Sequence, residues 1–323
     1  MTTKRWEHID LTRAIAVISV VAYHFLRINE IDGISTIINT YFLSIFFYLS
    51  GLLLRPEADK AWIIKKAKRL LVPLVAFTIL YIPILSLCKG ELIGTTLSDM
   101  FRSDSKGGYW FVYTLFSAMA LIWLIHYIYS VFALPKRLYP VLLILPWVIA
   151  FALSIFLPKE ISYWLSIPSF RRYYLFILLG MLCQEIRPQR YFTETISYAT
   201  LGGFYLLFIV LSLWKFQTVD SNLSFAVWFV ANVFGCLFIT ETCRRICQKH
   251  RIHRLTQWLS EDSLGIYLVQ FIIREVSRKP FMSLTLSPYI SFIPYTIVLL
   301  TASLTITRFI RKNKKTTKIF LGQ

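Results

Sequence analysis

Residues 9–24 read IDLTRAIAVISVVAYH, an apolar stretch interrupted by Asp10, Arg13 and His24. Ionisable residues inside a bilayer-spanning helix cost free energy, so by default they mark a functional site. His24 follows Arg13 by eleven positions. Eleven residues make almost three helical turns, so both side chains share one face, roughly 16 Å apart along the axis. Asp10 precedes Arg13 by three positions and can pair with it. The stretch therefore predicts a membrane helix with functional groups at two levels. The alternatives are a helix of a soluble protein and a charge at the end of a membrane helix that snorkels to the membrane surface.

The composition of the whole chain favours an apolar solvent over water. Of its 323 residues, 56% are hydrophobic and 16% are charged, whereas soluble proteins carry about 25% charged residues. The net charge is +18, but the basic residues lie in short loops between apolar runs, which is typical of membrane topology signals rather than of nucleic-acid binding. The five cysteines include no CxxC pair, so we expect no metal site.

About twenty apolar residues cross a bilayer, and the sequence contains roughly ten segments of that kind. We expect the first to remain as a membrane helix, since no cleavage site follows it. The segments begin near Ile9, Ser35, Leu70, Tyr109, Tyr139, Tyr173, Thr195, Asn222, Ser263 and Pro288.

The basic residues predict the orientation of these segments. Of the 35 Lys and Arg, 23 lie at the chain ends and in alternate loops, 11 lie on the opposite side, and Arg13 lies inside the membrane. Because Lys and Arg favour the cytoplasmic side, both termini are expected there. We therefore predict an all-α fold, a polytopic membrane helix bundle of about ten transmembrane helices. It forms one membrane-embedded domain over residues 1–323 with no separate soluble domain.

Several short motifs occur along the chain in a fixed order. They are Asp10-x-x-Arg13 with His24, FFYLSG at residues 46–51, KKAKRLLVP at residues 65–73, YWFV at residues 109–112, LGM at residues 179–181 and SLGIYL at residues 263–268. With these motifs the chain resembles the acyltransferase-3 family of multi-pass membrane O-acyltransferases over essentially its whole length. Two positions depart from the pattern, since relatives often carry His where this chain has Gly108 and Gln270. We assign Gln270 no role in proton transfer.

The resemblance implies an enzyme of the bacterial cytoplasmic (inner) membrane that moves an acyl group, with acetyl favoured. The expected donor is acyl-CoA, a co-substrate rather than a permanently bound cofactor. The expected acceptor is a hydroxyl of a cell-envelope glycan or another extracytoplasmic sugar. The expected partners are the lipid bilayer, acyl-CoA and a glycan or glycolipid, without nucleic acid.

The three ionisable residues of the first segment fit this chemistry as catalytic residues. A sugar hydroxyl needs a positioned base, and His24 supplies an imidazole whose neutral, basic form is favoured by apolar surroundings. An ion pair with Asp10 would hold Arg13 toward the bundle interior, where a guanidinium fork suits a phosphate or the thioester arm of CoA. The alternatives are a hydrogen-bonded structural histidine and a purely structural ion pair.

Lys66, Lys68 and Arg69 are the predicted cofactor-binding residues. A dense basic cluster at a helix start is a plausible dock for the phosphates of CoA, and Arg69 matches the family position before the proline. Topology signals and contacts with lipid headgroups give the same pattern of charges.

Ser50, Trp110, Arg172 and Tyr267 are the predicted substrate-binding residues. Ser50 precedes Gly51, which permits close approach of a backbone, although small residues are also common at contacts between membrane helices. Ser50 is also the one nucleophile we would nominate for an acyl-enzyme. Trp110 and Tyr267 line the site or pack in the core. Arg172 meets an anionic glycan or anchors to lipid phosphate.

Two other classes of protein remain open. A transporter or a flippase of lipid-linked glycans also carries buried charges, but the sequence contains no internal symmetry and no matching pair of broken helices. A membrane sensor or scaffold would need neither His24 nor Arg13 for chemistry.

Overall fold

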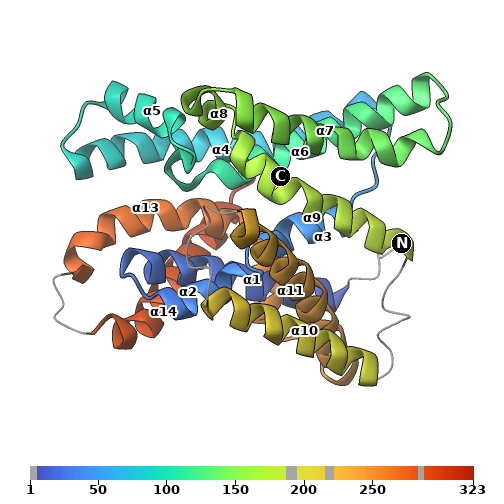
Figure 1. The fold of residues 1–323 in the computed structure, drawn as a ribbon. Helices are drawn as coiled ribbons and strands as arrows, with labels where there is room; N and C mark the ends of the chain where they lie inside the picture. Colours follow the sequence, from blue (N-terminus) through green and yellow to red (C-terminus); the bar gives the residue numbers. More distant parts are fainter. Residues whose placement is uncertain (1–5, 187–194, 215–221, 283–286) are drawn as a thin grey trace. The chain divides into compact units, whose positions relative to one another are not determined.

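In a computed structural model of the chain, residues 6–186, 195–214, 222–282 and 287–323 are described. Every regular element in these ranges is helical (Figure 1). The helices are α1 (Glu7–Ile28), α2 (Asp32–Asn39), α3 (Ser44–Leu52), α4 (Lys60–Lys89), α5 (Ile93–Arg102), the 3₁₀ turn η1 (Lys106–Gly108), α6 (Trp110–Val131), α7 (Leu138–Phe156), α8 (Lys159–Trp164), α9 (Ile167–Ile186), α10 (Thr195–Trp214), α11 (Asn222–Lys249), α12 (Arg254–Glu261), α13 (Ser263–Met282), α14 (Pro288–Arg311) and α15 (Lys314–Leu321).

Eight helical stretches in the described residues are long and apolar enough to cross a membrane. They correspond to eight of the predicted segments, so the all-helical class is confirmed, and these eight segments are helices able to cross a membrane by length and composition. The predicted segments near Tyr173 and Ser263 are also helices, α9 and α13, but each contains several charged residues. The count of ten spans and the cytoplasmic position of both termini stay predictions.

The helices gather into two compact units, each assembled from three separated parts of the chain. The first unit comprises Met1–Leu53, Leu179–Tyr267 and Leu284–Leu304. The second comprises Leu54–Leu178, Leu268–Ser283 and Thr305–Gln323. Three helices, α9, α13 and α14, therefore pass from one unit to the other along their length.

In the first unit, α1 is the central helix and packs against α2, α3, α11 and α12. Many of its core side chains are small or β-branched, including Ala16, Val17 and Val20, each at most 1% exposed. Small side chains let membrane helices approach closely. The same principle explains Gly180 in α9, where a Cβ would collide with the Tyr48 carbonyl oxygen and the Leu52 amide nitrogen of α3.

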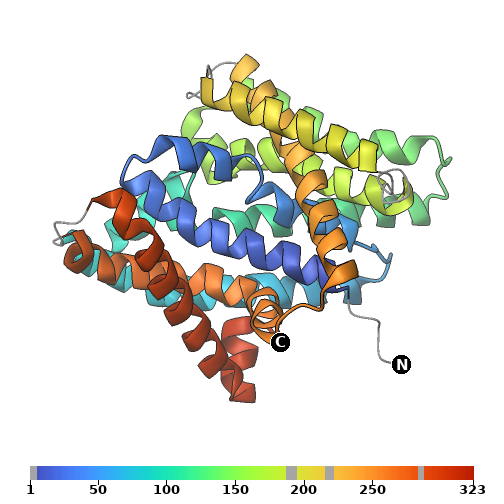
Figure 2. The same ribbon diagram turned by 90° about the horizontal axis from the view of Figure 1, so that it is seen from below.

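The second predicted segment contains a break, with α2 ending at Asn39 and α3 beginning at Ser44. A break exposes backbone groups that need partners where water is absent. Helix α11 supplies them: Trp228 Nε1 and Asn232 Nδ2 both donate to the Asn39 carbonyl, each at 3.2 Å. Asn232 Oδ1 also accepts from the Ser44 hydroxyl at 2.6 Å. Helix α10 lies along α11 and also contacts α2 (Figures 1 and 2).

In the second unit, α4 is the longest helix and packs against α5, α6 and α15. It begins at Lys60, ten residues before the predicted segment, because the Asp59 side chain caps it by accepting from the Ala61 amide at 3.1 Å. It ends at Lys89, and Gly90 terminates it by adopting the left-handed conformation, with a φ of 70°.

The loop before α6 is held by one buried cation. Lys106 is 5% exposed, and its ammonium donates to the carbonyls of Phe101, Tyr163 and Trp164 at 2.9–3.2 Å. Burial lowers the pKa of the Lys106 amine. At Gly108, φ is +100° and a Cβ would collide with the Phe271 ring. A side chain at this position, where relatives often have His, therefore does not fit this packing.

Candidate functional site

The predicted site residues divide between the two units. Asp10, Arg13, His24, Ser50 and Tyr267 belong to the first unit. The remaining predicted residues, Lys66, Lys68, Arg69, Trp110 and Arg172, belong to the second unit.

At the N-terminal end of α1, a serine of α12 connects the two predicted charges. The Ser260 hydroxyl donates to Asp10 Oδ1 at 2.6 Å and accepts from Arg13 Nη1 at 3.5 Å. Asp10 is 8% exposed and Ser260 is 1% exposed, so the connection is shielded from solvent. Hydrogen bonds to a charged group are among the stronger ones in proteins. Ser260 thus fixes Arg13 and Asp10 on the face of α1 that packs against α12.

The C-terminal part of α11 adds a second charged group beside this end of α1. Glu241 is 4% exposed and accepts from Arg244 Nε and Nη2 at 2.7 and 2.6 Å, and from Arg245 Nε at 3.0 Å. The Arg245 guanidinium also lies over the Tyr198 ring, 4.1 Å from its centroid. His8 of α1 lies within the electrostatic reach of Arg244, Glu241 and Asp10. Two arginines sharing one carboxylate leave one positive charge unmatched within this cluster of three side chains.

His24 lies at the opposite end of α1, between two aromatic contacts. The Tyr23 ring packs on Phe42 with centroids 4.4 Å apart, and Phe25 packs on Tyr295 at 4.7 Å. The imidazole is half-buried. It follows Arg13 by eleven positions of continuous helix, so the two-level arrangement expected for the first segment is present in α1.

Ser50 lies toward the Arg13 end of α1 rather than the His24 end. Helix α3 begins beside Asn232 of α11, and its Tyr48 is within electrostatic reach of Cys236 and Glu241, further along α11. Helix α11 itself runs from Trp228, near Tyr23 and Arg27, to Glu241, near His8. Because α3 follows α11 in this direction, Ser50 lies away from the His24 end, which disfavours it as a nucleophile activated by His24.

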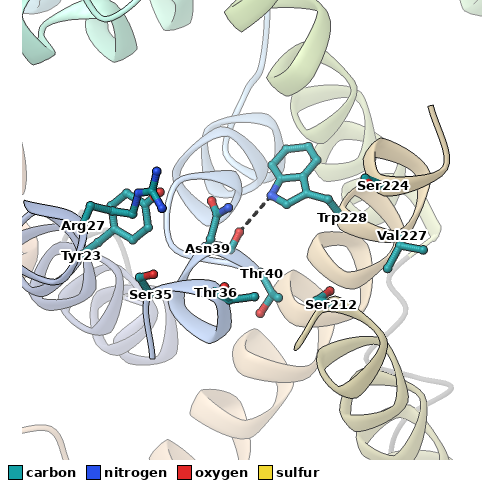
Figure 3. Close-up of a pocket in the computed structure, with 10 residues that line it drawn as sticks. All are labelled: Tyr23, Arg27, Ser35, Thr36, Asn39, Thr40, Ser212, Ser224, Val227 and Trp228. Atoms are coloured by element: carbon teal, nitrogen blue, oxygen red, sulfur yellow. Dashed lines mark hydrogen bonds between the residues drawn. The ribbon is translucent and has the colours of Figure 1, made fainter. Parts of the chain in front are cut away.

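A pocket opens beside the His24 end of α1, within the first unit. It has a volume of about 110 Å³ and collects polar side chains from four helices (Figure 3). Its lining residues are Tyr23, Arg27, Ser35, Thr36, Asn39, Thr40, Ser212, Ser224, Val227 and Trp228. His24 is adjacent in sequence to one lining residue, Tyr23, but does not itself line the pocket.

In the second unit, the three predicted CoA-binding cations lie in the first turns of α4. Lys66 Nζ is 5.1 Å from the centroid of the Trp62 ring, and Lys68 and Arg69 are exposed. Gly322, after the last turn of α15, packs so closely on this turn that a Cβ would meet the Lys68 carbonyl and Arg69 Cα. The end of α15 therefore supports the backbone that carries Lys68 and Arg69.

The other two predicted residues of the second unit lie close together. The Trp110 ring packs on Tyr173 of α9, with centroids 5.2 Å apart, and Tyr173 directly follows Arg172. Its neighbour Arg171 is engaged elsewhere, because its Nη1 donates to Ser154 at 2.9 Å and its carbonyl accepts from Trp147 Nε1 at 2.9 Å. Arg172 thus directly precedes the residue whose ring contacts Trp110.

Tyr267 and Gln270 are both buried, at 5% and 1% exposure. Neither polar atom of the Gln270 side chain has a hydrogen-bond partner within the described residues. Among those same residues, no group of three His, Cys, Asp or Glu side chains is placed to hold a metal ion.

Sequence reasoning missed four residues of the charged end of α1. Ser260 carried one signal, as a polar residue three positions before the SLGIYL motif. Arg244 and Arg245 are among the basic residues that predict the orientation of the segments, and Glu241 lies in an apolar segment outside every motif. An acidic residue three and four positions before two arginines is the pattern that would have indicated the pairing.

Comparison with known families identifies the chain. Residues 6–310 match the model of the Acyl_transf_3 family, described as an acyltransferase domain. No curated protein and no solved structure matches the chain. Because the match covers nearly all of the sequence, the chain belongs to the acyltransferase-3 family, and it is a membrane acyltransferase by this membership and by its apolar helices.

Proposed function

We propose that this acyltransferase moves an acyl group, with acetyl favoured, from cytosolic acyl-CoA to a hydroxyl of an extracytoplasmic sugar. The observation that carries the proposal is the division of α1 into a charged end at Arg13 and a histidine end at His24, eleven positions apart. The Arg13 guanidinium suits an anionic donor, and the imidazole suits a hydroxyl acceptor. One helix then links the two sides of the membrane.

His24 acts as the general base in this proposal. Its neutral imidazole takes the proton from the sugar hydroxyl while the hydroxyl oxygen bonds to the thioester carbonyl carbon. The carbon–sulfur bond then breaks, and the CoA thiolate leaves and takes the proton back from the imidazolium. The position of Ser50 away from the His24 end supports direct transfer rather than a serine-bound acyl-enzyme.

Arg13 holds the donor, and Asp10 and Ser260 hold Arg13. A guanidinium stays charged and can bind two oxygens at once, which suits a phosphate or the carbonyl groups of the CoA arm. Arg244 and Arg245 add positive charge at the same end of α1. In the second unit, Lys66, Lys68 and Arg69 form a separate candidate dock for CoA phosphates, for which lipid headgroups would compete.

One observation favours the transporter alternative. The break between α2 and α3 resembles the discontinuous helices that line binding sites in transporters. A transporter would leave its substrate chemically unchanged. Covalent label from acyl-CoA in the product therefore separates the two classes.

The test uses membranes that contain the intact protein or the His24→Ala variant at matched expression. Labelled acetyl-CoA is the donor, and a glycan extract from cells that carry this protein is the acceptor. We expect alkali-labile label in the glycan with the wild type, and a rate about 10²–10⁴-fold lower without the base.

The matched control for this test is His126→Ala. His126 is also a half-buried histidine, and its Nδ1 lies 3.4 Å from the Tyr139 hydroxyl. This variant should keep the full rate. Equal label with wild type and His24→Ala would exclude His24 as the base.

A further inference from the structure

The pocket at the His24 end of α1 is built from helix ends of the first unit. The C-terminal ends of α1 and α10 meet the N-terminal part of α11 and the α2 segment that leads into the break (Figure 3). On the predicted topology all four of these ends lie on the extracytoplasmic side. Non-helical backbone at membrane depth is tolerated where it is buried in protein or lines a cavity. The break at Asn39 and Thr40 does line this cavity.

The hydroxyl groups of the pocket are oriented to accept hydrogen bonds. The Ser35 hydroxyl donates to the Asp32 carbonyl at 3.0 Å, and the Ser212 hydroxyl donates to the Phe208 carbonyl at 2.7 Å. Thr40 donates to the Ile37 carbonyl at 2.6 Å and accepts from the Tyr205 hydroxyl at 2.8 Å, so one of its lone pairs is left for a ligand. A hydroxyl has one proton and two lone pairs, so these groups offer lone pairs to a ligand. They suit a ligand that carries several O–H donors.

Trp228 presents a fixed aromatic surface in the same pocket. Its ring nitrogen is held by the 3.2 Å bond to the Asn39 carbonyl (Figure 3). Val227 is the aliphatic lining residue among otherwise polar or aromatic ones. Pockets for drug-like or lipid ligands are mostly apolar, and this one is not. An indole face beside hydroxyl acceptors matches a sugar ring, which has an apolar C–H face and a polar edge.

The size and charge of the pocket limit the class of ligand that it can bind. A volume of about 110 Å³ holds roughly ten water-sized groups, at about 10–15 Å³ each, which is the scale of one sugar ring. Arg27 at the rim lies 3.3 Å from Asp32, and both side chains are more than half exposed. Because Asp32 compensates the Arg27 charge, the pocket favours a neutral sugar over an acidic one.

We propose that this pocket binds one neutral pyranose ring of the acceptor, stacked on Trp228, and thereby decides which hydroxyl reaches His24. Tyr23 and Arg27 place the pocket on the turn of α1 that carries His24. The inference rests on the proposed function for the identity of the reaction, but the presence of a sugar site does not depend on it.

The kinetic test compares Trp228→Leu and Trp228→Phe with Trp164→Leu, which changes an exposed tryptophan of the second unit. With the glycan extract as the varied substrate, Trp228→Leu should raise the acceptor KM about tenfold or more, since it removes the stacking surface. The KM for acetyl-CoA and kcat should stay within about twofold of wild type. Trp228→Phe, which keeps a ring, should recover most of the acceptor binding, and Trp164→Leu should change nothing.

A binding test without catalysis uses the Thr36→Cys variant and a membrane-impermeant maleimide. Thr36 is a half-buried lining residue, and the wild-type protein, whose own five cysteines are free, gives the background rate. Methyl β-D-glucopyranoside or methyl β-D-galactopyranoside at high millimolar concentration should slow the labelling. Sorbitol, an acyclic polyol without a stacking face, should not.

The outcomes separate the two proposals. Protection of the introduced thiol by a glycoside but not by sorbitol, with no acyl transfer by the wild type, would keep the sugar site and overturn the acyltransferase reaction proposed above. Acyl transfer by the wild type with an unchanged acceptor KM in Trp228→Leu and no protection would overturn the sugar site alone.

Discussion

The two ends of α1 differ in how the structure deals with polar groups. At the Arg13 end, charged side chains are paired with one another. Ser260 hydrogen-bonds to both Asp10 and Arg13, and Glu241 forms ion pairs with Arg244 and Arg245. At the His24 end, hydroxyl and amide groups leave a cavity beside a broken helix. Buried charges are costly unless paired, whereas hydroxyls can face a cavity with lone pairs unused. The first end is therefore suited to holding a charged donor, and the second to admitting a neutral acceptor.

The largest effect at the Arg13 end is expected for Arg13→Lys. Lysine keeps the positive charge but loses the guanidinium fork. The rate of transfer should fall about 100-fold, which corresponds to roughly 2.7 kcal/mol. The loss should appear mainly in kcat/KM for acetyl-CoA, while the acceptor KM should stay unchanged. Steady-state kinetics at matched expression measure this split. Full activity in Arg13→Lys would count against a forked contact with the donor.

Ser260→Ala sharpens the comparison, because it removes the link between Asp10 and Arg13 without removing a charge. Hydrogen bonds to charged groups contribute about 1.5–3 kcal/mol, so thermal stability should fall and the KM for acetyl-CoA should rise. The acceptor KM should not move. Ser263→Ala, at a half-buried serine three residues later, is the matched control. A raised acceptor KM in Ser260→Ala would mean that the two ends of α1 do not act separately.

The smallest effect is expected for Tyr205→Phe at the pocket end. The Tyr205 hydroxyl lies 2.8 Å from the Thr40 hydroxyl in a buried contact. Its removal should cost about 1 kcal/mol of stability, raise the acceptor KM slightly and leave the KM for acetyl-CoA unchanged. Thermal unfolding and the two KM values provide the readouts. An effect on acetyl-CoA alone would reverse the assignment of the two ends.

The sequence was sufficient for the helices and for the two levels of α1, because these depend on local properties. Apolar run length predicts membrane helices, and helical spacing relates Arg13 to His24. It was not sufficient for the break after Asn39. No Gly or Pro in the sequence marks that break. The exposed backbone carbonyl of Asn39 finds its hydrogen-bond donors in Trp228 and Asn232, almost two hundred residues later in the chain. The pocket depends on the same long-range contacts.

Ser260, Arg244 and Arg245 show a second limit of local reasoning. Positive residues at helix ends serve as topology signals in any membrane protein, so their type and position alone did not separate a structural charge from one that faces α1. For Arg244, the electrostatic interaction with His8 of α1 makes this distinction, whereas Arg245 lies over the Tyr198 ring of α10. Of the predicted cluster in the second unit, Lys68 and Arg69 are exposed and Lys66 is half-buried over the Trp62 ring; the function of the cluster stays a prediction.

The central claim is that the donor and the acceptor meet α1 from opposite sides of the membrane. The most direct measurement supplies labelled acetyl-CoA to only one face of sealed vesicles that contain the wild-type protein, in native and in inverted orientation. The account predicts that label enters the glycan only when acetyl-CoA bathes the cytoplasmic face. Transfer from acetyl-CoA supplied only outside vesicles of native orientation would contradict it.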